Sequence, residues 1–391
     1  MNRSFDIIVA GLGAVGSAAT YQLAKRGARV LGIDRFSPPH AHGSSHGETR
    51  ITRLAIGEGA HYTPLVMRSH EIWREIEQAT GSELLVQTGG LIISGRTNTP
   101  AMHVSGFFDN TVLAARKHGI PHELLDATSI RGSFPAFNVR DDEVGYYEPS
   151  AGFLRPEACI GGQLLLAEGH GAEIKRNETI LGFENETEGV LVRTDAGAYQ
   201  ARTVVLSLGP WLREFLDPRH VNLFKVTRQV LFWFEPRRGL EKFRVPQFPV
   251  YIWEPQNASQ AVYGFPALSD RGVKIASGAY GPAVAPNDLN REVTAREIDA
   301  MYREVVEPYF PDLSPTCLKT VTCLYTVTPD AGFVIDRSPR NPNVLIASAC
   351  SGHGFKHSAA VGEAIAESIL DGRSRLDLSP FELSRFDKSR H

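Results

Sequence analysis

Cysteine is scarce in this sequence: its 391 residues include only four, at positions 159, 317, 323 and 350. Four such widely scattered thiols do not match the disulfide framework of a small secreted protein. We therefore expect a reducing compartment and predict a cytoplasmic protein.

Long apolar runs and an excess of positive charge are also absent. No run approaches the roughly 18 residues that a membrane span needs. The first apolar run begins within five residues of the start, so no signal or transit peptide is expected. There are 41 basic and 44 acidic residues, for a net charge of −3, so no basic field indicates nucleic acid. We expect neither a membrane nor a nucleic acid as partner, and we predict no metal site.

The chemistry that is present begins in the first 34 residues. Asp6–Ala10 is an apolar run of strand length, and it leads into the glycine-rich stretch Gly11–Gly16. A helical segment, Ser17–Arg26, and a second strand, Ala28–Ile33, follow and end at Asp34. The order of strand, glycine turn, helix, strand and acid is the dinucleotide-binding fingerprint in its proper context. The pattern does not separate FAD from NAD.

Each part of this fingerprint has a physical role. Gly11 permits the tight turn, Gly13 lets a pyrophosphate approach the backbone, and Gly16 lets the helix pack closely on the strand. Free N–H groups at the helix start bind the phosphates, and the acid accepts a hydrogen bond from a ribose hydroxyl. The cofactor-binding residues predicted here are Gly11, Gly13, Ala14, Val15, Gly16 and Asp34.

The rest of the chain predicts two domains, as its length also does. Ile180–Glu184, Val190–Thr194 and Gly197–Ala201 predict a small meander, which is followed by a separate buried strand at Thr203–Gly209. This arrangement resembles FAD-binding proteins of the glutathione-reductase type. The predicted fold class is α/β, with a Rossmann-like FAD-binding domain and an α+β substrate domain whose large sheet is mostly antiparallel. The expected FAD-binding domain comprises residues 1–85, 145–220 and 321–391, and the substrate domain comprises residues 86–144 and 221–320.

Three further motifs are long enough to identify a family. They are Gly43-Ser44-x-His46-Gly47-x-Thr49-Arg50-x-x-Arg53, Cys323-x-Tyr325-x-x-x-Pro329-Asp330 and Ser351-Gly352-His353-Gly354-Phe355-Lys356. With the fingerprint, they make the chain similar to the monomeric sarcosine oxidase and N-methyltryptophan oxidase family. The likeness runs in unbroken order from residue 5 to about residue 386.

The resemblance implies a flavoprotein oxidase acting on the carbon–nitrogen bond of a secondary amine that carries a carboxylate. It implies FAD linked covalently through Cys323, dioxygen as the second substrate and a monomeric enzyme. Oxidation of an N-methyl group would release an amino acid, formaldehyde and hydrogen peroxide. The flavin supplies the difficult chemistry, and the protein supplies orientation and electrostatics.

The resemblance also assigns roles to single residues. Lys274 matches the lysine that activates dioxygen, where a preplaced ammonium stabilises developing negative charge. Arg53 and Lys356 match the pair that holds the substrate carboxylate. Tyr263 and Tyr325 match tyrosines retained at the substrate site. The residues implied along the flavin are Ser44, His46, Thr49, Arg50, Cys323, Gly352, His353, Gly354, Phe355 and Lys356.

Two departures from the family pattern concern the substrate pocket. This chain has Ile56 where sarcosine oxidases have a tyrosine, and Gly278 where they have a histidine. If nothing fills the space, the pocket is larger and more apolar than one built for sarcosine. We therefore expect N-methyl amino acids with a bulkier side chain.

Other functions remain open at this point. Within the oxidases, the alternatives are sarcosine, pipecolate and fructosyl amino acids. An NAD-dependent dehydrogenase would use the same glycine turn but would not need Cys323. A binding module without activity would have lost the chemical residues, whereas Lys274, Arg53 and Lys356 are all present.

Overall fold

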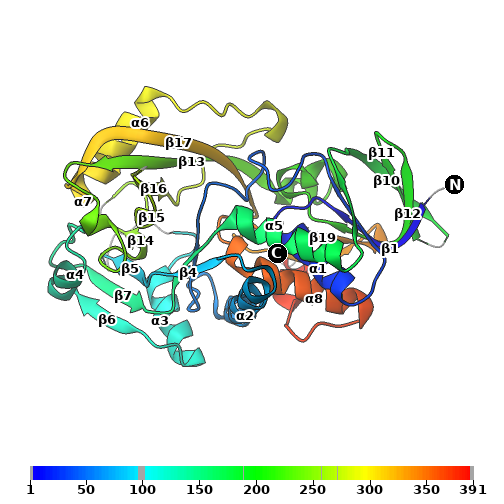
Figure 1. The fold of residues 1–391 in the computed structure, drawn as a ribbon, viewed down its shortest axis with the longest axis horizontal. Helices are drawn as coiled ribbons and strands as arrows, with labels where there is room; N and C mark the ends of the chain where they lie inside the picture. The colour runs from blue at the N-terminus through cyan, green and yellow to red at the C-terminus, as the bar shows by residue number, and fades with distance from the viewer. Residues whose placement is uncertain (1–2, 96–101, 188, 257, 271, 388–391) are drawn as a thin grey trace.

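The computed structural model describes residues 3–95, 102–187, 189–256, 258–270 and 272–387. Residues 1–2, 96–101, 188, 257, 271 and 388–391, which fall within the expected domain segments, lie outside this description. Two large sheets lie at opposite ends of the molecule, each with helices packed beside it (Figure 1). This arrangement confirms the predicted α/β class.

The first large sheet contains the N-terminal fingerprint. Its main path runs β10-β11-β12-β1-β2-β9, and β19 joins β12 and carries β18. The bounds are β1 (Arg3–Ala10), β2 (Val30–Asp34), β9 (Glu173–Arg176), β10 (Ile180–Glu186), β11 (Gly189–Thr194), β12 (Ala198–Leu206), β18 (Val334–Ser338) and β19 (Asn341–Ser348). Helix α1 (Ala14–Lys25) packs between α5 (Pro156–Gly169) and α8 (Ser358–Leu370), and α2 (Thr63–Thr80) packs on α8. The end of β1, Ile7–Ala10, and all of β2 are buried and pair in parallel, which explains why Ile7–Ala10 and Val30–Ile33 carry no polar side chain.

The predicted break between the meander and the buried strand is wrong. A single strand, β12 (Ala198–Leu206), performs both roles. Its first half pairs with β11 in antiparallel register, and its last residues pair with β19 in parallel register. Because β1 pairs with it along nearly its whole length, the strand is continuous where the local turn signal suggested a break.

The second large sheet runs β17-β13-β16-β15-β14-β5-β7-β6 and is antiparallel except for the pair β14 and β5. Its strands are β5 (Gly90–Ser94), β6 (Glu123–Asp126), β7 (Val144–Glu148), β13 (Lys225–Pro236), β14 (Val250–Glu254), β15 (Val262–Gly264), β16 (Val273–Ser277) and β17 (Leu313–Val327). The accompanying helices are α3 (Phe107–His118), α4 (Ala127–Ser133), α6 (Ala295–Met301) and α7 (Glu307–Tyr309). A small third sheet joins β3 (Arg50–Thr52), β8 (Gly152–Leu154) and β4 (Leu85–Gln87).

Strand β17 (Leu313–Val327) has no counterpart in the sequence prediction, although it is 15 residues long. It lies at the sheet edge, pairs with β13, and includes Pro315 in its exposed first half. An edge position tolerates the proline and polar residues that hide the strand pattern. The expected domain boundary at 320/321 falls inside this strand, the one at 144/145 falls inside β7, and the one at 85/86 falls inside β4. The two-domain division stays a proposal, with these three boundaries moved to the strand ends.

Two helices have unusual ends. A 3-10 turn, Ala60–Tyr62, leads directly into α2, whose first residue is Thr63. Helix α6 begins with a Thr294 capping box and changes to a π turn at Tyr302–Val306. In the described part of the chain, no helix is both long and apolar enough to cross a membrane.

Candidate active site

The glycine turn between β1 and α1 leaves the start of the helix open to a ligand. Gly13 is the N-cap of α1, no side chain caps the helix, and its first turn contains no acid. A Cβ at Gly13 would have its nearest contact at 3.7 Å, with Ser45 Oγ. Gly13, Ala14 and Val15 line a large cavity. The free N–H groups at this helix start therefore fit a pyrophosphate.

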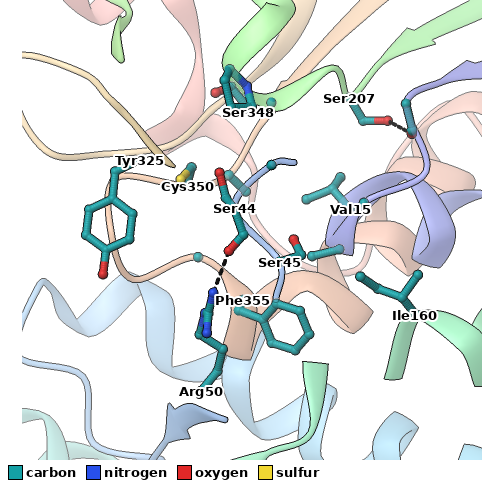
Figure 2. A pocket seen from close by; sticks show the side chains of 18 of the residues that line it. Val15, Ser44, Ser45, Arg50, Ile160, Ser207, Tyr325, Ser348, Cys350 and Phe355 are labelled. Atoms are coloured by element: carbon teal, nitrogen blue, oxygen red, sulfur yellow. Dashed lines mark hydrogen bonds between the residues drawn. The ribbon is translucent and has the colours of Figure 1, made fainter. Parts of the chain in front are cut away.

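The other two glycines allow close backbone packing. Gly11 has a φ of +84°, and a Cβ there would lie 2.6 Å from the carbonyl oxygen of Ser207. Ser207 Oγ donates to the Gly11 carbonyl at 2.7 Å (Figure 2). A Cβ at Gly16 would lie 1.8 Å from the same Gly11 oxygen. Gly16 therefore brings helix and turn together and does not itself line the cavity.

Asp34 lies at the carboxyl end of β2 and faces the same cavity. Its carboxylate accepts hydrogen bonds from the backbone N–H groups of Leu12, at 2.8 Å, and Phe36, at 2.9 Å. Each carboxylate oxygen can accept more than one hydrogen bond, so the group can still accept one from a ribose hydroxyl.

The cavity continues from the glycine turn to the second large sheet. Its volume is about 1850 Å³, including the part open to solvent. Ile252, Tyr263, Lys274 and Tyr325, on four strands of the second sheet, line its far end. All predicted site residues line the cavity except Gly16, His46 and Cys323. Figure 2 shows Val15 and Tyr325 on opposite sides of this space.

Lys274 is buried on β16 and is held from several directions. Its Nζ donates to the carbonyl oxygen of Gly47 at 2.6 Å, and to the carbonyl and hydroxyl oxygens of Thr49 at 3.1 and 2.8 Å. The ring centres of Phe265 and Trp233 lie 4.4 and 5.3 Å from Nζ. Burial lowers the pKa of Lys274 well below its usual value, and nearby Arg50 reinforces this. The three hydrogen-bond acceptors and the two aromatic faces act in the opposite direction, because they stabilise the charged form of Lys274.

The loop that contacts Lys274 is itself held by Arg50. The Arg50 guanidinium donates to the carbonyl oxygen of Thr49 at 2.8 Å, and to that of Ser44 at 2.6 Å (Figure 2). His46 of the same loop is buried outside the cavity lining. Burial and Arg50 lower the pKa of His46 to about 3. His46 therefore supports the loop as a neutral ring and does not face the cavity.

Arg53 and Lys356 come together around a carboxylate that the motif analysis did not assign, Glu58. Arg53 donates to Glu58 at 2.7 Å, and Lys356 Nζ lies 3.8 Å from the other carboxylate oxygen. All three side chains are at most 5% exposed. Burial opposes ionisation of Glu58, but Arg53 and Lys356 hold its pKa well below the usual value. Burial lowers the pKa of Lys356 to about 7 against the opposing effect of Glu58.

This cluster can still bind a ligand. Arg53 Nε is buried and has no hydrogen-bond partner within the described residues, and the guanidinium lies over the ring of Phe107 at 5.0 Å. Lys356 Nζ donates to one carbonyl, that of His353, at 2.7 Å. An ammonium has three N–H donors, so Lys356 retains donors for a ligand. The signal for Glu58 was present in the sequence as the turn Gly57-Glu58-Gly59.

Cys323 and the two tyrosines lie on the face of the second sheet beside the cavity. The Tyr263 and Tyr325 hydroxyl oxygens are 3.0 Å apart and share a hydrogen bond. Cys323 is 1% exposed and packs in a cluster with Tyr325 and Cys350. Burial raises the pKa of the Cys323 thiol, while Arg50 opposes this. Cys350, which the motifs did not single out as a site residue, lines the cavity.

The empty space expected beside Gly278 is not there. A Cβ at Gly278 would lie 2.4 Å from the sulfur of Met102, so Met102 occupies the volume that a side chain at 278 would take. Ile56 is fully buried in the hydrophobic core beside α2 and does not line the cavity. Ile56 and Gly278 therefore do not enlarge the pocket, and that expectation is wrong. Met102 and its neighbour His103, which line the cavity, were not predicted.

A dinucleotide-binding turn joined by one cavity to a buried group of cations indicates an oxidoreductase with a dinucleotide cofactor. The chain matches the family described as FAD dependent oxidoreductase over residues 6–368. It belongs to this family, and FAD rather than NAD is its cofactor. The alternative of an NAD-dependent dehydrogenase is thereby excluded.

Individual relatives agree with this family. The chain is 40% identical to a monomeric sarcosine oxidase of Streptomyces avermitilis over 388 residues, which are 98% of each chain. It is 36% identical to an N-methyl-L-tryptophan oxidase of Yersinia pestis over 385 residues, 98% of this chain and 99% of the relative. Among solved structures, NikD, an amino acid oxidase, superposes with a TM-score of 0.82 at 22% identity over 97% of both chains. The resemblance inferred from the motifs is confirmed.

Proposed function

We propose that the protein is an FAD-dependent oxidase of N-methyl amino acids. The reaction consumes the N-methyl amino acid, dioxygen and water, and it produces the amino acid, formaldehyde and hydrogen peroxide. The observation that carries this proposal is the placement of Arg53 and Lys356, both buried, in the cavity that begins at the dinucleotide-binding turn. The relatives named sarcosine oxidase and N-methyl-L-tryptophan oxidase support the same reaction class.

In this proposal the substrate carboxylate binds to Arg53 and Lys356. Glu58 holds the two cations together before the substrate arrives. The unpartnered Arg53 Nε and the remaining Lys356 N–H groups then provide donors for the carboxylate. With Lys356 protonated, the three groups carry a net positive charge, which favours binding of one carboxylate. Bound FAD supplies the acceptor for the hydride of the N-methyl group.

The remaining walls select the substrate side chain. Ile51, Ile252 and Phe265 line the cavity together with Met102 and Tyr263, so the wall is largely apolar. We propose that apolar side chains are preferred over the hydrogen of sarcosine, since each Å² of apolar surface buried contributes roughly 25 cal/mol. Sarcosine, pipecolate and fructosyl amino acids are the competing substrates.

The test is a peroxide-coupled assay of the purified holoenzyme. The substrates are N-methylglycine, N-methylalanine, N-methylleucine, N-methyltryptophan, pipecolate and a fructosyl amino acid, each beside its decarboxylated amine where one exists. We expect N-methylleucine or N-methyltryptophan to have the highest kcat/KM. Removal of the carboxylate should cost at least about tenfold, because truncating one partner of a buried charged contact costs roughly 2–5 kcal/mol. Equal rates for the amine and the amino acid would contradict the carboxylate site.

Lys274 is proposed to serve dioxygen rather than the amine. Its ammonium contacts Gly47 and Thr49 in a loop that lines the cavity, where a fixed positive charge stabilises the superoxide formed by the first electron transfer. Lys274→Met should slow flavin reoxidation by roughly 10²–10³ and leave anaerobic reduction nearly unchanged, both measured by stopped flow. Lys319→Met is the matched control, because Lys319 lies 4.8 Å from the same Trp233 ring but is paired with Glu48. Equal losses in both half-reactions would contradict the role.

Two finer points complete the proposal. We propose that Cys323 is joined by a thioether to a methyl group of the flavin ring. The bond replaces the thiol hydrogen and one methyl hydrogen, the two electrons reduce the flavin, and dioxygen reoxidises it.

The proposed enzyme is a cytoplasmic monomer. The name of one relative, monomeric sarcosine oxidase, supports the monomer.

A further inference from the structure

His103 is an imidazole of the cavity wall to which no role has been given. It lies in the short segment between β5 and α3 and lines the same cavity as Arg53 and Lys356. The backbone N–H of its neighbour Met102 donates to the carboxylate of buried Glu254 at 3.1 Å. If Gly352 carried a Cβ, that atom would lie 2.9 Å from His103 Cε1 and 3.0 Å from Tyr325 Cε2. The two rings therefore approach the same point beside Gly352. The imidazole is therefore beside the tyrosine pair proposed for the substrate.

The hydrogen bonds of Tyr280 determine which ring nitrogen of His103 carries the proton. The Tyr280 hydroxyl donates to the carbonyl oxygen of Ser351 at 2.8 Å and lies 3.0 Å from His103 Nδ1. A hydroxyl has one proton, and the carbonyl can only accept. Both contacts are hydrogen bonds only when His103 Nδ1 carries the proton and donates to the Tyr280 oxygen. Nε2 is then an unprotonated acceptor, because the hydrogen bond that joins the His103 ring to another described residue is the one at Nδ1.

Burial, reinforced by nearby cations, keeps the His103 ring neutral. Burial lowers the pKa of His103 to about 3; Glu58 opposes the shift, whereas His353, Lys356 and Arg53 reinforce it. The His353 ring, 5.5 Å away between centres, donates through Nε2 to the Ala331 carbonyl. Burial lowers the pKa of His353 to about 4. Both rings are therefore neutral at physiological pH, and the nearby charges are those of the carboxylate site.

A neutral secondary amine needs such an acceptor. When its nitrogen lone pair is directed at the flavin, its single N–H points elsewhere, and leaving that donor unpaired in a buried site is costly. In an α-amino acid the nitrogen is separated from each carboxylate oxygen by only three bonds. An acceptor beside the carboxylate site is thus within reach of the N–H. Taking the proposed function as its basis, we propose that His103 Nε2 accepts the hydrogen bond of the substrate amine N–H and so selects secondary over tertiary amines.

The test compares a secondary amine with the tertiary amine that lacks the hydrogen. The holoenzyme and His103→Leu are assayed with N-methylleucine and N,N-dimethylleucine. We expect His103→Leu to lower kcat/KM for N-methylleucine by about tenfold to hundredfold and to change that for N,N-dimethylleucine by less than about threefold. The decisive quantity is the ratio of kcat/KM for N-methylleucine to kcat/KM for N,N-dimethylleucine, because a general loss of structure would lower both values. The Kd of (methylthio)acetate, in which sulfur replaces the N–H group, should also stay within about threefold.

Companion variants separate the acceptor from the shape of the ring. His103→Gln retains an acceptor oxygen and should recover part of the preference for the secondary over the tertiary amine. His122→Leu removes an imidazole that stacks on Tyr146 outside the cavity and should change nothing. If the His103→Leu protein does not accumulate with bound flavin, Tyr280→Phe is measured instead. This change removes the hydroxyl that holds the proton on His103 Nδ1, and it should reduce the ratio of kcat/KM between the secondary and the tertiary amine several-fold.

Two results would overturn the inference, and they are distinguishable. A wild-type enzyme that contains flavin but oxidises none of the N-methyl amino acids would overturn the proposed function and this inference with it. An active wild type whose His103→Leu variant keeps the same ratio between the two amines would overturn the role of His103 alone.

Discussion

The two buried lysines of the cavity differ in what holds them. Lys274 has an acceptor for each of its three N–H groups, so its position is fixed and its proposed role is that of a fixed charge. Lys356 has one backbone acceptor and a carboxylate at 3.8 Å, so it can still bind a ligand and its protonation depends on what is bound. A buried lysine with few partners loses its proton readily. The pH dependence of ligand binding should therefore originate at Lys356.

We predict that carboxylate binding weakens as the pH rises through neutrality. The pKa of Lys356 is lowered to about 7 by burial, so the ammonium is present below this pH and is lost above it. A carboxylate binds the charged form, so the Kd of (methylthio)acetate should be flat below about pH 7 and should rise above it by up to tenfold per pH unit. Titration of the flavin absorbance measures this Kd. Lys356→Gln should bind more weakly and show a flat profile; a sloping profile in that variant would assign the titration to another group.

At the scale of elements, the site depends on how closely helix α1 approaches the turn that precedes it. The helix packs between α5 and α8 and directs its uncapped N-terminus at the cavity. The approach is possible because Gly16 has no side chain where the Gly11 carbonyl lies. A backbone oxygen cannot move aside as a flexible side chain can, so an added methyl must displace the helix or the turn.

Gly16→Ala should therefore weaken both folding and FAD binding. The added Cβ would lie 1.8 Å from the Gly11 oxygen and 2.6 Å from Ser207 Oγ, and overpacking of this kind costs roughly 1–3 kcal/mol. Urea unfolding and the flavin content of the purified protein measure the two effects. Gly161→Ala is the control: Gly161 lies inside α5, and a Cβ there would meet nothing within 4 Å. That change should be neutral or stabilising by up to about 1 kcal/mol, and equal damage from both changes would contradict the packing argument.

At the scale of the whole molecule, the cavity lies between two sheets that have separate cores. The glycine turn and Asp34 come from the first sheet, whereas Lys274, Tyr325 and the proposed flavin-linked Cys323 come from the second. A flavin held at both ends would connect the sheets across the cavity. Attachment of the flavin should therefore raise the free energy of unfolding of the entire chain, because a ligand that binds only the folded state stabilises that state.

We predict that Cys323→Ser makes the stability dependent on free FAD. Wild-type protein should keep its flavin fluorescence on a denaturing gel, and its Tm should not change with added FAD. Cys323→Ser should lose that fluorescence, and its stability should rise by about 1.4 kcal/mol for each tenfold increase in FAD above the Kd. Cys350→Ser is the matched control, since Cys350 lies beside Cys323 and lines the cavity but should leave the link intact. A wild-type band without fluorescence would contradict covalent attachment while leaving FAD binding in place.

The sequence by itself determined the local features of the protein. The fingerprint from β1 to Asp34 was predictable because strand, turn and helix are encoded by neighbouring residues, and each glycine answers a backbone requirement within the turn. The motifs around Arg53, Cys323 and Lys356 likewise identified the family, because each role belongs to a short run of residues. The α/β class followed from the same local signals.

Tertiary structure decided the features that depend on residues far apart in the chain. Edge strand β17 and the unbroken β12 are fixed by their pairing partners, which local propensity does not encode. Met102 fills the space beside Gly278 from 176 positions away, so a glycine in the sequence did not mean a void. Glu58 and His103 acquire their roles from the cations and hydroxyl groups that folding places around them. Electrostatics and packing act through space, and only the folded chain specifies those distances.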